Sequence, residues 1–126
     1  MLFRSNRDAV LFCGVMDYRP NHDAARWLLD DIWPRVQREH PHAVLTIAGS
    51  APQASLRARA AGRADVRITG HVADVRPYFW QSAVFVAPLR LARGVQNKVL
   101  DAAVAGLPSV VTSTVYEGLP AQVRPA

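Results

Sequence analysis

The residues with the clearest chemical potential lie between positions 88 and 101, where an apolar strand is followed by a glycine and then by a helix. Three cations, Arg90, Arg93 and Lys98, gather around the expected start of that helix. The backbone N–H groups of a helix start are unpaired and the helix dipole is positive there, so an anion is favoured. Cations in the same place cost stability unless an anion compensates them, and this conflict indicates an anion-binding function. The alternative is that all three are solvated surface charges.

Asp101 is the acidic group of the same segment. It lies among aliphatic residues of the expected helix, where its carboxylate could accept hydrogen bonds from vicinal sugar hydroxyls. The alternative is a carboxylate on a solvated helix face, or one that is paired with Lys98. A ligand with sugar hydroxyls is therefore one of two interpretations of Asp101.

Several other catalytic patterns are missing from the sequence. No Gly-x-Gly-x-x-Gly follows the first apolar run and no Walker lysine pattern occurs, which disfavours dinucleotide-dependent dehydrogenases and P-loop enzymes. The four histidines lack metal-ligand spacing, and Ser109 and Ser113 lack the surroundings of a nucleophilic serine. Cys13 lies inside an apolar run, so we expect an inert buried thiol. The three tryptophans are expected to pack in the protein rather than to stack on a ligand: Trp27, Trp33 and Trp80.

Five apolar runs predict the strands that must position these residues. Continuous apolar runs are typical of strands covered on both faces, as in parallel sheets. The predicted strands cover residues 9–14, 43–48, 66–69, 83–87 and 109–112.

Four helical patterns alternate with these strands. The first has apolar residues at helical spacing between positions 25 and 36, and Pro34 is expected to kink or split it. The others are residues 53–61, a short helix with Asp74 as its N-cap, and residues 96–105. The alternation predicts one α/β domain with an open, doubly wound parallel sheet. Ligands of such sheets bind beyond the carboxyl ends of the strands, where the strand order reverses.

Composition excludes several classes of protein. The chain has 126 residues, 50% of them hydrophobic, which is enough for one globular domain. The formal net charge of +5 comes from scattered arginines, with Lys98 as the only lysine, so nothing indicates a nucleic-acid partner. The single cysteine excludes an internal disulfide, and no apolar stretch reaches the roughly 20 residues that span a bilayer. Residues 1–8 lack the apolar core of a signal peptide, so we expect a cytoplasmic protein without a transmembrane segment.

Several segments, in order, resemble the donor-nucleotide half of retaining glycosyltransferases of the GT-B architecture, in the large family 4 group of bacterial sugar transferases. Residues 14–21 are similar to the motif Gly-x-Met-x-Tyr-x-Pro-Asn of one subgroup, which residues 32–34 and 70–76 also match. Residues 94–108 are similar to its signature Gly-x-x-x-Lys-x-x-Glu-Ala-x-Ala-x-Gly-x-Pro, and residues 117–118 resemble the Glu-Gly that follows the fifth strand. The resemblance covers nearly the whole chain and implies a Rossmann-like fold.

The resemblance also implies a binding site for the diphosphate of a UDP- or GDP-sugar. Arg90 and Lys98 would act in catalysis by neutralising the phosphates of the departing diphosphate. The backbone would help at five further positions: Gly14, Gly94, Val95, Gln96 and Asn97. No metal and no separate cofactor is implied, because the nucleotide sugar is itself the substrate.

The nucleoside part of the donor would lie beside two other segments. The backbone of His71 and Val72 falls where the family contacts the base, and Asp101 falls where a glutamate holds the ribose. Two positions depart from the family pattern. The first glutamate of the Glu–seven residues–Glu motif is Arg93 here, and the second is the shorter Asp101, so the sugar and ribose contacts are expected to differ.

The resemblance implies that the chain is a truncated C-terminal half of a larger protein. The acceptor-binding half is absent, so we expect no sugar transfer by this chain alone, and an uncovered face that allows self-association. The full-length parent would act on a polysaccharide or lipid-linked acceptor, either in the cytoplasm or at the inner face of the membrane. Two alternatives stay open: a non-catalytic Rossmann-like binding or interaction module, and one half of a GT-B-type sugar-nucleotide epimerase.

Overall fold

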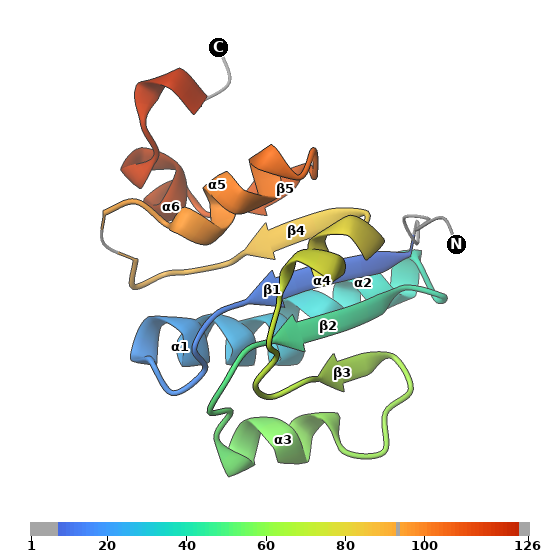
Figure 1. The fold of residues 1–126 in the computed structure, drawn as a ribbon. Coiled ribbons are helices and arrows are strands. Elements are labelled where there is room, and N and C mark those ends of the chain that lie inside the picture. Colours follow the sequence, from blue (N-terminus) through green and yellow to red (C-terminus); the bar gives the residue numbers. More distant parts are fainter. Residues whose placement is uncertain (1–7, 93, 124–126) are drawn as a thin grey trace.

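A computed structural model describes residues 8–92 and 94–123 of the chain. Its five strands form one parallel sheet in the order β3-β2-β1-β4-β5 (Figure 1). The register places Leu11 of β1 between Thr46 of β2 and Phe85 of β4. The strands are β1 (Ala9–Cys13), β2 (Val44–Ala48), β3 (Val66–Ile68), β4 (Val84–Ala87) and β5 (Ser109–Val111). The predicted parallel α/β sheet is confirmed.

Helices cover both faces of this sheet. They are α1 (Arg19–Trp27), α2 (Trp33–Glu39), α3 (Ala54–Ala60), α4 (Arg76–Gln81), α5 (Asn97–Val104) and α6 (Ser113–Gly118). The chain runs from β1 to the β3 edge and then crosses back to β4 on the other side of β1. Because parallel crossovers are right-handed, this reversal sends α4 and α5 to the opposite face from α1 and α3. Figure 1 shows α2 behind β1 and α4 in front of it, as in a doubly wound sheet.

The first long helix is interrupted just before Pro34. α1 ends at Trp27, a π-helical segment spans Leu28–Ile32, and α2 begins at Trp33. Proline has no N–H to donate to the preceding turn, and its ring collides with a carbonyl of that turn. A π-helical turn directly before the proline accommodates both effects. The predicted splitting of this helix is confirmed.

Two local features differ from the prediction. Val75, not Asp74, is the N-cap residue of α4, and the Asp74 carboxylate accepts a hydrogen bond from the Arg76 backbone N–H at 3.0 Å. The chain also continues after β5 into the unpredicted α6, followed by a 3-10 turn over Ala121–Val123. The Thr112 hydroxyl caps α6 by accepting a hydrogen bond from the Val115 N–H at 3.3 Å. A threonine at this position is the local signal for that helix start.

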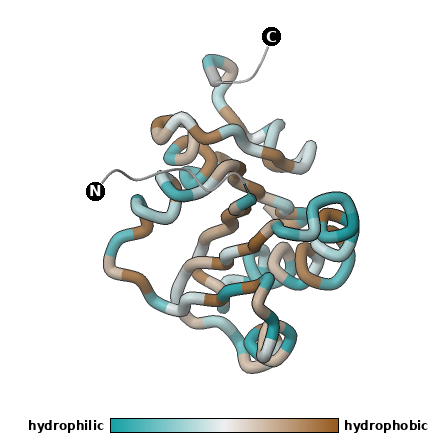
Figure 2. Tube along the Cα trace, turned by 90° about the vertical axis from the view of Figure 1, so that its right-hand side faces the viewer, coloured by the Kyte–Doolittle hydropathy of each residue, from teal (hydrophilic) through white to brown (hydrophobic). Residues whose placement is uncertain are grey.

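The hydrophobic core lies against the central strands. Figure 2 shows hydrophobic segments gathered inside the molecule and hydrophilic segments mostly on its outer turns. Trp33 is fully buried as expected, whereas Trp80 is 46% exposed and departs from the expectation of a packed side chain. The largest fully buried side chains are Trp33, Phe12, Phe85, Leu11 and Met16.

The edge strand β5 leaves apolar surface uncovered. Val110 is 61% exposed and lines a groove of about 380 Å³ together with residues of β1, β4 and α2. Open strand edges and apolar patches favour pairing with another chain. Self-association of this domain stays a prediction.

Asp65 ties α2 to the β3 edge of the sheet. Its carboxylate accepts a hydrogen bond from Trp33 Nε1 at 2.9 Å and forms an ion pair with Arg63 at 2.8 Å. The hydrogen bond from the Arg63 guanidinium is the largest of several effects that hold the pKa of this carboxyl below its ordinary value. A carboxyl with a lowered pKa in the folded state stabilises the fold above its unfolded pKa, and this contribution is lost as the pH falls through the folded pKa.

We therefore expect Asp65→Asn to lower the free energy of unfolding at pH 7 by about 1 kcal/mol or less, because the ion pair is partly exposed. The difference from the parent protein should shrink when the pH is lowered to about 3, below the ordinary carboxyl pKa. Urea unfolding at both pH values measures this. A difference that is the same at pH 7 and pH 3 would contradict the role of the ionised carboxylate.

Candidate functional site

Three of the predicted phosphate-site residues, Gly14, Arg90 and Lys98, follow the two strands between which the strand order reverses, β1 and β4. The loop after β1 leads to α1 on one face, and the loop after β4 leads to α5 on the other. We call this place, at the carboxyl ends of β1 and β4, the switch point. It is where ligands of doubly wound sheets bind.

The backbone is tightly packed on the β1 side of the switch point. Gly14 donates its N–H to the Ala48 carbonyl at 3.0 Å, and Met16 donates to the Ser50 carbonyl at 2.8 Å. A Cβ atom on Gly49 would collide with the carbonyl oxygen of Gly14. Glycine at position 49 therefore allows the loops after β1 and β2 to touch, and this contact fixes Gly14 at the end of the sheet.

Lys98 extends from the first turn of α5 to the end of β1. Its Nζ atom donates a hydrogen bond to Asn21 Oδ1 at 2.7 Å and lies 5.4 Å from the centre of the Phe12 ring. A Cβ atom on Gly14 would lie 2.8 Å from the same Nζ atom, so the ammonium rests against this glycine. The structure thus brings together Lys98 and Gly14, two of the predicted phosphate-site residues. It directs the lysine inward rather than to bulk solvent.

Burial is the main electrostatic effect on this lysine. Desolvation lowers the pKa of Lys98 below its ordinary value, and the smaller effect of the nearby Cys13 acts in the opposite direction. Burial also raises the pKa of the Cys13 thiol to about 11, although the Lys98 charge opposes this. The thiol is therefore protonated at neutral pH, as expected for an inert buried cysteine.

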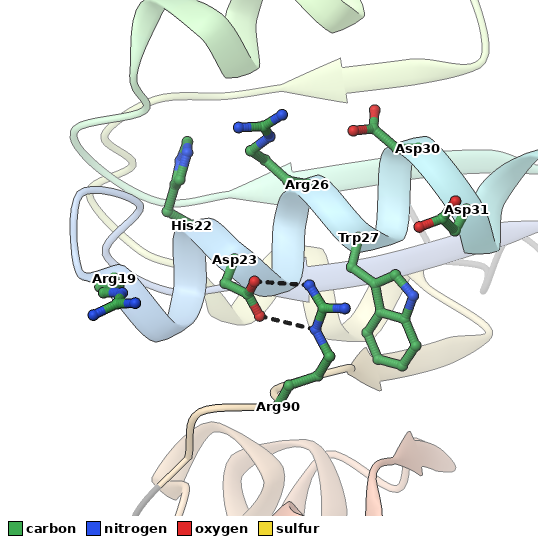
Figure 3. A pocket seen from close by; sticks show the side chains of 8 residues that line it. All are labelled: Arg19, His22, Asp23, Arg26, Trp27, Asp30, Asp31 and Arg90. Carbon is green, nitrogen blue, oxygen red and sulfur yellow. Dashed lines mark hydrogen bonds and ion pairs between the residues drawn. The ribbon is translucent and has the colours of Figure 1, made fainter.

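Arg90 lies at the other side of the switch point and is already paired. Its guanidinium forms two hydrogen bonds with the Asp23 carboxylate of α1, at 2.7 and 3.1 Å, and lies 4.7 Å from the centre of the Trp27 ring. Asp23 and Arg90 both line a hollow of about 320 Å³. Figure 3 shows this pair on one side of α1, with His22 and Arg26 on the other. The hydrogen bonds to Asp23 raise the pKa of Arg90 further. Arg90 thus fastens the loop after β4 to α1, and its charge is shared with a carboxylate.

Residues 94–97 lead into α5 and lie largely at the surface of the domain. Gly94, Val95 and Asn97 are exposed, and Gln96 occupies the N-cap position without a capping hydrogen bond from its side chain. A Cβ atom on Gly118 would collide with the Gly94 carbonyl oxygen, so the end of α6 packs against this segment. The structure therefore brings the Glu117–Gly118 pair next to the predicted phosphate loop. Arg93 lies outside the described residues.

Asp101 lines a hollow of about 520 Å³ between α4 and α5, which we call the α4–α5 hollow. The segment 73–76 also lines it, as do Trp80 and Val104 further along the two helices. His71 is exposed and Val72 half-buried, directly before that segment in the chain. The predicted ribose residue and the loop after β3, which carries the predicted base contacts, therefore adjoin one hollow.

Three residues of this region were not predicted to take part in the site. Asn21 holds Lys98, while Asp23 and Trp27 hold Arg90. The sequence motif that ends at Asn21 is a signal for that residue, although it does not reveal the partner. No sequence signal identifies Asp23 or Trp27, because their contacts join positions far apart in the chain.

The described ranges 8–92 and 94–123 contain neither a candidate metal-ligand cluster nor a helix that could cross a membrane. No three His, Cys, Asp or Glu side chains gather there into a set that could hold a metal ion. No helix in these ranges is long and apolar enough to cross a membrane.

The strand order and the switch point together define a Rossmann-like α/β domain. Residues 7–125 match the family model described as "Glycosyl transferases group 1", and the chain therefore belongs to this family. No curated protein sequence matches the chain. In structure it is similar to a chain of the GtfA/B complex, with a TM-score of 0.68 and 16% sequence identity. This similarity, which shows the fold, covers 87% of our chain and 22% of the length of the GtfA/B chain.

Proposed function

We propose that this domain binds the diphosphate of a UDP- or GDP-sugar at the switch point. The observation that carries the proposal is the Lys98 ammonium, which is held beside Gly14 and hydrogen-bonded to a neutral amide. A diphosphate is bound by positive charge and by backbone N–H groups at a helix start. Lys98 offers the charge, and the first N–H groups of α5 would add to it.

The nucleoside would occupy the α4–α5 hollow. Its volume of about 520 Å³ lies within the usual range of roughly 300–1,000 Å³ for small-molecule pockets. The Asp101 carboxylate would accept hydrogen bonds from the ribose hydroxyls, and the backbone around His71 and Val72 would contact the base. The exposed Trp80 adds an aromatic surface to this hollow.

In the proposed reaction the domain acts as the donor half of a retaining, metal-independent glycosyltransferase. The departing nucleoside diphosphate gains negative charge, which Lys98 and the start of α5 would stabilise without a metal ion. Transfer also needs an acceptor, for which we propose a polysaccharide or a lipid-linked sugar in the cytoplasm. Because both substrates must be held in contact, we expect transfer only when a second, acceptor-binding part is present.

One observation favours the competing interpretation of a non-catalytic module. Arg90, the second cation expected at the phosphates, is engaged by the Asp23 carboxylate. A diphosphate would have to compete with this carboxylate for the guanidinium, or bind without it. Nucleotide binding by the isolated domain therefore separates the two functions.

We expect UDP or GDP to bind the domain and to change its tryptophan fluorescence through Trp80 in the α4–α5 hollow. Asp101→Asn should weaken this binding and reduce the preference for ribose over deoxyribose nucleotides, since it removes the charged acceptor. Asp101→Glu should strengthen it. Calorimetry and fluorescence titrations with UDP, GDP and their deoxy forms measure these effects.

Trp80→Phe serves as the control for the optical signal, because it removes the indole and retains an aromatic ring. The fluorescence response of this variant to nucleotide should be smaller than that of the unmodified domain, while calorimetry should still detect binding. Absence of binding by every nucleotide to the unmodified domain would contradict the donor function and favour the non-catalytic module.

A further inference from the structure

Asn21 is one of two buried polar side chains among the described residues, the other being Ser82. It lies in the first turn of α1, with 5% of its surface exposed. Both ends of its amide are used. Nδ2 donates to the Val15 carbonyl at 3.0 Å, and Oδ1 accepts from Lys98 Nζ at 2.7 Å. The first bond fixes the orientation of the amide, so that its oxygen faces the lysine.

The two cations of the switch point have partners of different charge. Arg90 is paired with the carboxylate of Asp23, whereas the hydrogen-bond partner of Lys98 is a neutral amide. A carboxylate in the place of Asn21 would compensate the ammonium and compete with an incoming anion. An amide holds the ammonium in place and leaves its full charge available.

The geometry also leaves the ammonium able to bind a second group. A lysine ammonium has three N–H donors. Among the described residues, the hydrogen-bond acceptor of the Lys98 ammonium is Asn21 Oδ1. The Phe12 ring and Gly14 also lie close to the Lys98 ammonium, and neither accepts a conventional hydrogen bond from it. At least one donor can therefore turn to a ligand while the bond to Asn21 is kept.

We propose that Asn21 is a positioning residue, which holds the Lys98 ammonium against Gly14 with its charge uncompensated, ready for a diphosphate. The proposal rests on the proposed function and adds a residue that acts through Lys98 rather than on the nucleotide itself. It explains a buried amide that joins the first turn of α1 to α5 across 77 positions of the sequence.

A double-mutant cycle tests this dependence. Asn21→Ala should weaken UDP or GDP binding by roughly tenfold, because a hydrogen bond that positions a charged group is lost. In a Lys98→Met background the same Asn21→Ala change should alter the affinity by less than about twofold, since the group on which it acts is gone. If Asn21 has only a structural role, its effect should be similar in both backgrounds, which would overturn the proposal. Circular dichroism confirms that each variant is folded.

Because Lys98 is the only lysine of the chain, a sample with isotope-labelled lysine gives one side-chain ammonium signal by nuclear magnetic resonance. Asn21→Asp should raise the pKa of this ammonium, since it introduces a carboxylate, and should weaken nucleotide binding by about tenfold or more at pH 7. Gln81→Glu adds the same charge on α4, at the amino ends of the strands, and should change neither quantity. If Asn21→Ala does not fold, Asn21→Asp tests the positioning role of Asn21 in its place.

The two hypotheses fail in different ways. If Asn21→Asp leaves the Lys98 pKa and the nucleotide affinity unchanged, positioning by Asn21 is overturned even though the domain binds nucleotide. If the Lys98 signal responds to substitution of Asn21 but never to UDP or GDP, positioning is supported and the proposed ligand is overturned.

Discussion

Lys98→Met is expected to weaken the binding of UDP and GDP by roughly tenfold to hundredfold, the usual range for loss of a charge-assisted contact. The substitution keeps an unbranched aliphatic side chain and removes the ammonium that lies over the Phe12 ring and rests against Gly14. Because the interaction is between a cation and a diphosphate, the loss should be larger at low than at high ionic strength. Calorimetric titrations at two salt concentrations measure both effects.

Arg38→Ala is the matched control, because it also removes one positive charge. Arg38 is exposed in the last turn of α2, before β2 and therefore at the opposite end of the sheet from the switch point. Its substitution should leave nucleotide affinity nearly unchanged. Equal losses in the two variants would indicate that only the overall charge of the domain matters, and would contradict a phosphate site at Lys98.

The fold could be predicted from the sequence because its signals are local. Apolar runs bounded by glycine and proline place all five strands, and Pro34 indicates the interruption that the structure resolves as a π-helical segment. The predicted N-cap of α4, Asp74, lies one residue before the observed N-cap, Val75. The Asp74 carboxylate accepts a hydrogen bond from a backbone N–H of α4 without occupying the N-cap position itself. The missed α6 has only six residues and starts from a single capping threonine, so its local signal is short.

The site could be predicted only in part, because its contacts depend on topology. The pattern around Lys98 and Asp101 indicated a ligand at the start of α5, and the structure places the lysine at the switch point. What the lysine contacts is set by strand order, which brings α1 next to α5 across the sheet. For the same reason the pairing of Arg90 with Asp23, 67 positions away, has no local signal.

Gly49→Ala is expected to lower the free energy of unfolding by about 3 kcal/mol or more, among the larger effects of a single substitution. The added Cβ atom would meet the carbonyl oxygen of Gly14, a backbone atom that cannot move away by rotating a side chain. Gly49 also has a φ angle of +144°, which side chains rarely adopt. Both effects act on the contact between the loops after β1 and β2, so the Lys98 site should be displaced as well. Urea unfolding and UDP titration of the folded fraction measure the two consequences.

Gly62→Ala separates the cost of the positive φ angle from the cost of the collision with a neighbouring backbone atom. Gly62 has a φ angle of +73° but no atom within 4 Å of the position of an added Cβ, so only the backbone conformation is penalised. Its substitution should cost about 1–2 kcal/mol and leave nucleotide binding intact. If Gly49→Ala costs no more than Gly62→Ala, the close approach of the two loops does not stabilise the domain. If it costs several kcal/mol more and nucleotide binding falls with it, the loop contact that fixes Gly14 at the end of the sheet also maintains the position in which Lys98 can receive a diphosphate.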